Sequence, residues 1–91
     1  MQHVACLVVT YRNGRALAAY YHLPGRAGRK SHKSRVAEAG LVIDFARNGD
    51  PLGIEITSPQ IVTLAALRRV MKTLGVPPVK SIELAPLRAA P

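Results

Sequence analysis

The sequence predicts an α+β fold in which an antiparallel sheet of about four strands carries one C-terminal helix. Two observations lead to this prediction. Short apolar runs flank the Asn-Gly dipeptides at 13–14 and 48–49, and such a dipeptide between two apolar runs is typical of a β-hairpin. After the second hairpin, apolar residues recur at helical spacing. The 91 residues are therefore expected to form one domain, with a two-hairpin sheet at 4–57, a helix at 59–74 and a C-terminal tail at 76–91.

The first hairpin joins VACLVVTY at 4–11 to ALAAYYHL at 16–23. Neither run alternates cleanly between apolar and polar residues. Both faces of this part of the sheet are therefore expected to be covered, by the helix on one side and by a partner chain on the other. The next segment, PGRAGRKSHKS at 24–34, contains no large apolar side chain and is predicted to form a loop.

The second hairpin, at 40–56, has the clearest pattern in the chain. With Asn48-Gly49 at the centre of the turn, alternate residues fall on opposite faces of the hairpin. Asp44 and Glu55 lie together on one face. The other face is apolar and is built from three cross-strand pairs, Phe45 with Leu52, Ile43 with Ile54, and Leu41 with Ile56.

The helix at 59–74 has recognisable ends. Ser58 is the predicted N-cap, Pro59 occupies the first helical position, and Gly75 follows the last turn. Beyond Pro77-Pro78, the segment VKSIEL at 79–84 is predicted to add a short edge strand. The predicted core-facing arc of the helix consists of Leu64, Leu67, Val70, Met71 and Leu74, and the opposite arc carries Arg68, Arg69 and Lys72.

The two hairpins resemble the YuzE-like family of small uncharacterised bacterial proteins over roughly residues 7–58. The resemblance rests on VIDFARNGDPLGIEI at 42–56 and, more loosely, on ALAAYYHL at 16–23. It implies the fold but no activity, and it implies an antitoxin-like role as the partner of another small protein. The chain departs from the family at the first turn, where it carries Arg12 and Arg15 in place of acidic residues. Its basic loop and C-terminal helix also look like additions.

Composition restricts the classes of protein to consider. The net charge of +8 makes polyanions candidate partners and also favours solubility. The single cysteine, Cys6, excludes an internal disulfide and any metal site built from cysteines. No apolar stretch is long enough to cross a membrane, and the N-terminus lacks the pattern of a signal peptide. A cytoplasmic location away from membranes is therefore expected.

Asp44 and Glu55 are the most patterned polar residues. Two carboxylates on one hairpin face are chemically able to hold a divalent cation or to act as acid and base. However, no further ligand completes a metal site, no nucleophile stands beside a histidine, and His22 and His32 show no ligand spacing. The sequence therefore predicts no enzyme, catalytic residue, metal or cofactor. It predicts instead that the two carboxylates pair with Arg35, Arg47 or an arginine of a partner.

The basic segment is the second candidate site. Five cations without an intervening acid suit a phosphate backbone, although no aromatic residue is interleaved for base stacking. The candidate nucleic-acid-binding residues are Arg26, Arg29, Lys30, Lys33 and Arg35, together with Arg68, Arg69 and Lys72 if the helix presents them on the same side.

These observations support two functional hypotheses. The first is a non-enzymatic interaction module, either a homodimer or the partner of another small protein, that uses an open sheet face or edge. The alternative is a protein that binds DNA or RNA without sequence specificity through the 26–35 loop and the basic face of the helix.

Overall fold

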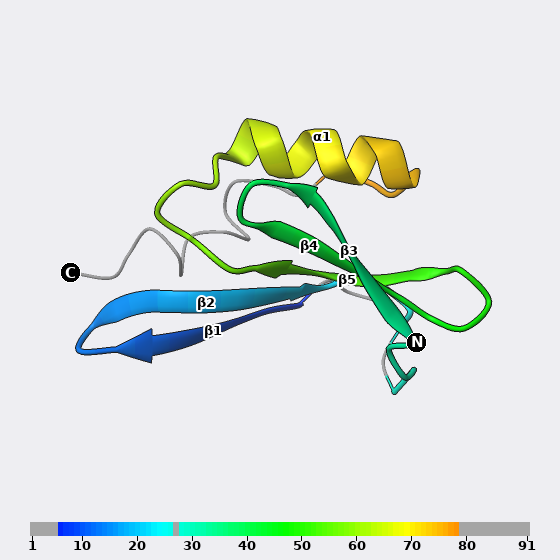
Figure 1. Ribbon diagram of the computed structural model, residues 1–91, viewed down its shortest axis with the longest axis horizontal. Helices are drawn as coiled ribbons and strands as arrows, with labels where there is room; N and C mark the ends of the chain where they lie inside the picture. Colours follow the sequence, from blue (N-terminus) through cyan, green and yellow to red (C-terminus); the bar gives the residue numbers. More distant parts are fainter. Residues whose placement is uncertain (1–5, 27, 79–91) are drawn as a thin grey trace.

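The computed structural model describes residues 6–26 and 28–78. These residues form a five-stranded antiparallel sheet with one helix on one face (Figure 1). The order of the strands in the sheet is β1-β2-β5-β4-β3. The predicted α+β class is therefore confirmed, with one strand more than the number predicted. The elements are β1 (Cys6–Arg12), β2 (Arg15–His22), β3 (Lys33–Glu38), β4 (Leu41–Phe45), β5 (Pro51–Ile56) and α1 (Leu64–Leu74).

The unpredicted strand, β3, occupies one edge of the sheet. Its sequence, KSRVAE, begins inside the segment that we expected to be a loop and pairs with β4. All its residues except Glu38 are exposed. Because an edge strand exposed in this way needs no apolar alternation, the hydrophobic pattern gives no signal for it. Lys33 and Arg35 therefore lie on a strand and not in a loop.

The two hairpins differ in how well their register was predicted. In the first, Arg12 pairs with Arg15 across Asn13 and Gly14, both at positive φ, which is the two-residue turn that Asn-Gly favours. In the second, the predicted pairs Leu41–Ile56 and Ile43–Ile54 are confirmed.

Near the second turn, however, Phe45 pairs with Pro51 and not with Leu52. The physical reason is the length of the turn. The Ala46 amide donates to the Asp50 carbonyl (2.8 Å), so three residues form the loop and Gly49 takes a φ of 93°. A three-residue loop ending in a left-handed glycine introduces a bulge, which moves the pairing by one residue.

The helix begins five residues later than predicted. Thr63, not Ser58, is the N-cap, and its hydroxyl accepts a hydrogen bond from the Ala66 amide (3.0 Å). Residues 58–61 form a turn instead, in which the Ile61 amide donates to the Ser58 carbonyl (3.1 Å). The predicted end is confirmed, because Gly75 caps the helix in the left-handed conformation.

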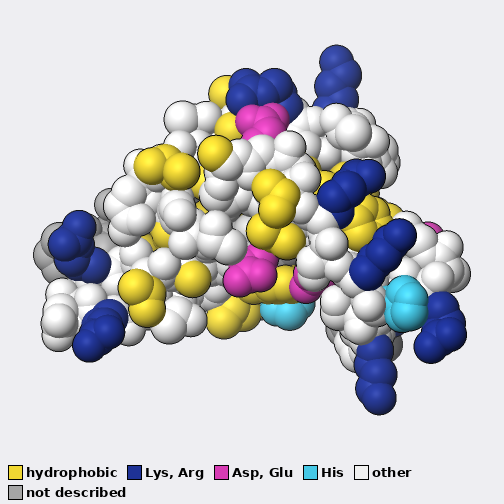
Figure 2. Space-filling model, viewed as in Figure 1, with side chains coloured by type: hydrophobic (Ala, Val, Ile, Leu, Met, Phe, Trp, Pro, Cys, Tyr) yellow, Lys and Arg dark blue, Asp and Glu magenta, His cyan; other side chains and the backbone are white. Residues whose placement is uncertain are grey.

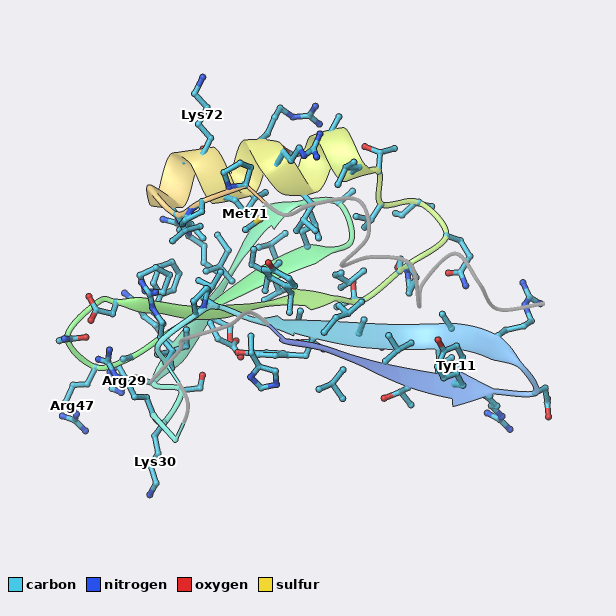
Figure 3. The ribbon with its side chains drawn as sticks, turned by 180° about the vertical axis from the view of Figure 1, so that it is seen from behind. Tyr11, Arg29, Lys30, Arg47, Met71 and Lys72 are labelled. Carbon is cyan, nitrogen blue, oxygen red and sulfur yellow. The ribbon has the colours of Figure 1, made fainter. Side chains whose placement is uncertain are left out.

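The core lies between α1 and one face of the sheet. Leu67, Val70 and Met71 are buried, while Leu64 and Leu74 pack against the core at its margin, so the predicted apolar arc is confirmed. Figure 3 shows Met71 directed from the helix toward the strands. The sheet contributes Ala19, Tyr21, Leu41, Ile43, Ile54 and Ile56.

No described element covers the other face of the sheet (Figure 1). The predicted edge strand at 79–84 lies outside the described residues. Among the described helices, none is long and apolar enough to cross a membrane.

Replacing Thr63 with alanine should lower the free energy of unfolding by about 1 kcal/mol, because the helix loses its side-chain cap. Ser58→Ala is the matched control and should change stability by less than about 0.5 kcal/mol, since Ser58 does not cap the helix. Urea unfolding followed by circular dichroism measures both. Equal losses in the two variants would contradict the assignment of the cap.

The open face of the sheet as the candidate functional site

The uncovered side of the sheet, here called the open face, carries two adjacent rows of residues that run across the strands. The strand registers place the members of each row directly opposite one another. The first row is Val8, Tyr20, Glu55, Val42 and Val36, and the second contains His22, Gly53, Asp44 and Ser34.

Tyr20 links the two rows by crossing over Gly53. Its hydroxyl, on β2, donates to Asp44 Oδ2 on β4 (3.0 Å), so the ring spans the intervening strand β5. A Cβ atom at position 53 would overlap the Tyr20 ring. Only glycine leaves room for this crossing, which explains a glycine in the middle of a central strand.

Asp44 accepts a second hydrogen bond from the other side. The Ser34 hydroxyl on β3 donates to Asp44 Oδ1 (2.5 Å). Two hydroxyls therefore bind the two carboxylate oxygens, and the chain Tyr20–Asp44–Ser34 connects strands β2, β4 and β3. On its other side, the Tyr20 ring lies beside the ring of His22, with centroids 4.6 Å apart.

The surroundings of Tyr20 keep its phenol protonated. Burial, the hydrogen bond to Asp44 and the negative charges of Asp44 and Glu55 all raise its pKa well above the ordinary value. Each of these effects disfavours a phenolate at this position. Tyr20 is therefore a fixed hydrogen-bond donor.

Within the described residues, Asp44 binds Tyr20 and Ser34 and not Arg35 or Arg47, whereas pairing with an arginine of a partner chain stays a prediction. Arg35 lies over the Phe45 ring instead, with its guanidinium carbon 5.2 Å from the ring centroid. Glu55 is exposed, and its side chain forms no hydrogen bond or ion pair with the described residues. Within residues 6–26 and 28–78, the ion pairs are Arg29–Asp50 and Arg69–Glu38, each at 2.9 Å.

Among the predicted loop cations, two arginines are tied to the protein itself. Arg26 donates to the carbonyls of Pro24 (2.6 Å) and Pro51 (3.2 Å). Arg29 donates to Asp50 and to the side-chain oxygen of Asn48 in the β4–β5 turn, and this ion pair lowers the pKa of Asp50. Lys30, Lys33 and Arg35 are exposed.

The helix cations do not join those of the loop. Figure 3 shows Lys72 directed away from the sheet on the helix side, whereas Lys30 extends from the opposite side of the molecule. Arg69 makes two hydrogen bonds to Glu38, at 2.9 and 3.1 Å, which lower the pKa of that carboxyl group. Lys30 and Lys72 therefore do not belong to one basic surface, whereas Arg35 lines a hollow together with Val70 and Thr73 of the helix.

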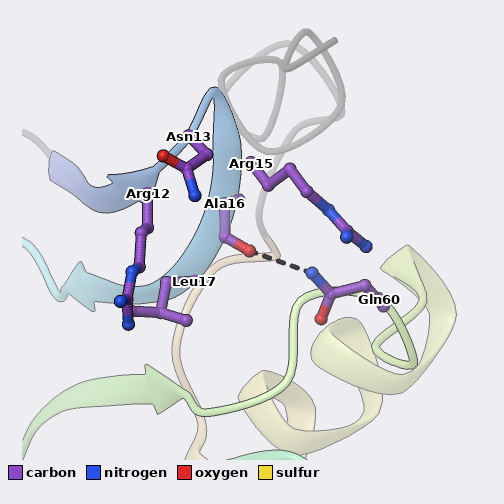
Figure 4. Close-up of a pocket in the computed structure, with 6 residues that line it drawn as sticks. All are labelled: Arg12, Asn13, Arg15, Ala16, Leu17 and Gln60. Atoms are coloured by element: carbon purple, nitrogen blue, oxygen red, sulfur yellow. Dashed lines mark hydrogen bonds between the residues drawn. The ribbon is translucent and has the colours of Figure 1, made fainter.

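A separate hollow of about 400 Å³ lies where the β1–β2 turn approaches the segment before the helix (Figure 4). Gln60 donates to the Ala16 carbonyl there (2.9 Å) and so ties this segment to β2. Arg12 and Arg15 line the hollow. In the described part of the chain, no three His, Cys, Asp or Glu side chains lie close enough together to hold a metal ion.

Comparison with known proteins adds no assignment, because no protein-family description, curated protein or solved structure matches the chain. The resemblance to the YuzE-like family therefore stays a prediction, and the functional argument rests on the geometry of the open face.

Sequence reasoning placed Asp44 and Glu55 on one face but missed Tyr20 and Ser34 as partners. The signal for Tyr20 was Gly53, since a glycine within a strand commonly marks the close approach of another group. Ser34 gave no signal, because its strand was itself not predicted.

Replacing Gly53 with alanine should lower the free energy of unfolding by about 2 kcal/mol or more, because the new Cβ displaces the Tyr20 ring. The backbone itself accepts alanine, since Gly53 is not at positive φ. In a Tyr20→Ala background the same substitution should cost less than about 1 kcal/mol. A double-mutant cycle by urea unfolding measures the coupling, and additive losses would contradict the steric role of Gly53.

Tyr20→Phe should lower stability by about 1 kcal/mol at neutral pH, because it removes the hydrogen bond to Asp44. The folded protein raises the pKa of Tyr20 above the unfolded value of about 10. The stabilisation is therefore fully present below about pH 10 and is lost as pH rises toward the folded pKa. Urea unfolding of both proteins from about pH 7 to about pH 11 tests this. The advantage of the wild type over Tyr20→Phe should shrink at alkaline pH, and an unchanged advantage would contradict it.

Proposed function

We propose that the chain is a non-enzymatic interaction module that binds another protein through the open face. The observation that carries this proposal is an exposed carboxylate in the same row as exposed aliphatic side chains, on the face that no described element covers. Val8 is 50% exposed and Val36 is 70% exposed, while Glu55, in the same row, is exposed and unpaired among the described residues. Exposed apolar groups beside an unpaired charge are what a docking partner buries and neutralises.

The charge on the open face specifies the chemistry of the partner. Asp44 and Glu55 are its charged residues in the described structure, and no cation lies in either row (Figure 2 shows acidic side chains among hydrophobic ones). A complementary surface therefore presents aliphatic side chains around a lysine or arginine that reaches Glu55. The partner is thus a protein with a basic patch, although this chain is itself basic.

A second copy of the chain fits the open face less well. In a symmetric dimer the same surface meets itself. Stacking two open faces would bring Glu55 and Asp44 of one copy toward the same carboxylates of the other, and like charges at close range are unfavourable. The resemblance implies an antitoxin-like role. Such a role is a contact with a different protein, as the charges on the open face also favour.

The proposal needs neither a catalytic residue nor a cofactor. It places the protein in the cytoplasm, where a single cysteine without a disulfide is ordinary.

In-cell photo-crosslinking tests the proposal. A photoreactive phenylalanine analogue at Val8 or Val36 should yield one discrete adduct with a different protein. The same analogue at Ile61, which is 61% exposed and lies outside the sheet, is the matched control and should not yield it. The captured protein is then purified, and calorimetry compares its binding to the wild type, Glu55→Lys and Lys72→Glu.

Glu55→Lys should weaken binding roughly tenfold or more, because it places a cation against the basic patch of the partner. Lys72→Glu, a charge reversal on the outer side of the helix, should bind like the wild type. The proposal would be overturned if the adducts contained only a second copy of the chain, or if the analogue at Ile61 gave the same adduct. It would also be overturned if the wild type and the two variants bound the captured protein with equal affinity.

A further inference from the structure

Cations from two separate segments meet at one end of the sheet. Figure 3 shows Arg29 and Lys30 of the loop after β2 at the same end of the molecule as Arg47 of the β4–β5 turn. The link between the segments is Arg29, which binds Asp50 and Asn48 of that turn. We call this region the basic end, and it consists of Arg26, Arg29, Lys30, Lys33, Arg35 and Arg47.

The hydrogen bonds divide five of these six cations into two groups, while the sixth, Arg35, lies over the Phe45 ring. Arg26 and Arg29 hold the loop against the β4–β5 turn through backbone carbonyls and Asp50. Lys30, Lys33 and Arg47 are exposed, and their side chains make no hydrogen bond or ion pair with the described residues. The first pair shapes the basic end, and the other three remain free to bind an anion.

A groove of about 360 Å³ lies at this end of the sheet, and of the three free cations Lys33 lines it. It is lined by Lys33, Ser34, Arg35, Phe45 and Gly49. The Arg35 guanidinium lies over the partly buried Phe45 ring at 5.2 Å. Arg35 is exposed, so its guanidinium is accessible to solvent next to the Phe45 ring.

This arrangement places an aromatic ring, Phe45, among the cations of the basic segment, which contains no aromatic residue of its own. A planar guanidinium held on an aromatic ring is a surface on which a nucleobase stacks. The bases of a duplex are already stacked on one another, whereas those of a single strand are available. Lys33 in the lining of the groove, together with Lys30 and Arg47 elsewhere on the basic end, suits the phosphates on either side of such a base.

We propose that the groove at the basic end binds single-stranded nucleic acid without sequence specificity. Lys30, Lys33 and Arg47 contact phosphates, and one base stacks on Arg35 above Phe45. The cations of α1 take no part. This site is independent of the open face, so its failure would leave the interaction-module proposal unchanged.

Fluorescence anisotropy with a labelled, mixed-sequence single strand of roughly 12 nucleotides tests the site. Titrations between about 50 and about 150 mM salt give the dependence of log affinity on log salt. The triple variant Lys30→Ala, Lys33→Ala, Arg47→Ala should reduce the magnitude of this slope by about 2, because each phosphate neutralised on a single strand adds about 0.7 to it. The control removes three exposed cations elsewhere, by Arg12→Ala, Arg15→Ala and Lys72→Ala, and should largely retain the slope.

The stacking step has its own variant. Arg35→Lys keeps the charge but removes the planar group, and should weaken single-strand binding several-fold while leaving binding to a duplex of the same sequence unchanged. Three outcomes would each overturn the proposal. The first is the absence of single-strand binding at about 150 mM salt. The others are equal losses of slope in the two triple variants and an equal effect of Arg35→Lys on the binding of single strands and of duplex.

Discussion

The crossing of Tyr20 over Gly53 is the constraint on which the open face depends. The first and second hairpins are joined where β2 pairs with β5 over four residue pairs, and the Leu23 amide extends this junction by donating to the Leu52 carbonyl (3.1 Å). On the helix side, the core packed beneath α1 holds this junction together. On the open side, the Tyr20 hydroxyl passes across β5 to reach Asp44, and Ser34 extends the connection to the edge strand β3. A side chain at position 53 would overlap the Tyr20 ring, so Gly53 is what allows Tyr20 to reach Asp44.

The features that the sequence predicted are those with a local cause. Asn13-Gly14 sets its own turn through two positive φ angles, and Gly75 ends the helix in the same way. The predictions fail where two segments both fit the same structural role, or where the residues that cause a structure are distant in the sequence. Ser58-Pro59 and Thr63 both fit the start of a helix, and the choice depends on burying Pro59 and Val62 against the fold. Strand β3 exists because β4 offers it a pairing edge, which no periodicity in KSRVAE records.

The same distinction separates the two candidate sites. Alternation along the second hairpin was enough to place Asp44 and Glu55 on one face, because residues two apart in a strand share a face. The partners of Asp44 come from β2 and β3, 24 and 10 residues away in the chain. In the same way, Phe45 joins the basic segment only through the pairing of β3 with β4, which sets Lys33 opposite it. Residue spacing along a strand shows which side chains share a face of the sheet. The pairing of strands distant in sequence decides which side chains lie next to one another on that face.

The placement of the acids explains how a chain of net charge +8 presents an acidic surface. Among the described acids, Glu38 and Asp50 each bind an arginine, whereas Asp44 and Glu55 remain on the open face without one. Strand β5, which carries Glu55, lies two strand spacings from β3, which is about 9.6 Å. The Debye length at physiological salt is about 8 Å, so the cations at the edge are already screened from the centre of the open face. At about 0.01 M salt that length rises to about 30 Å, and the surplus cations then dominate both surfaces. At low salt, the net charge of the whole protein therefore determines which ligands are attracted. At physiological salt, the charges within each surface determine what that surface attracts.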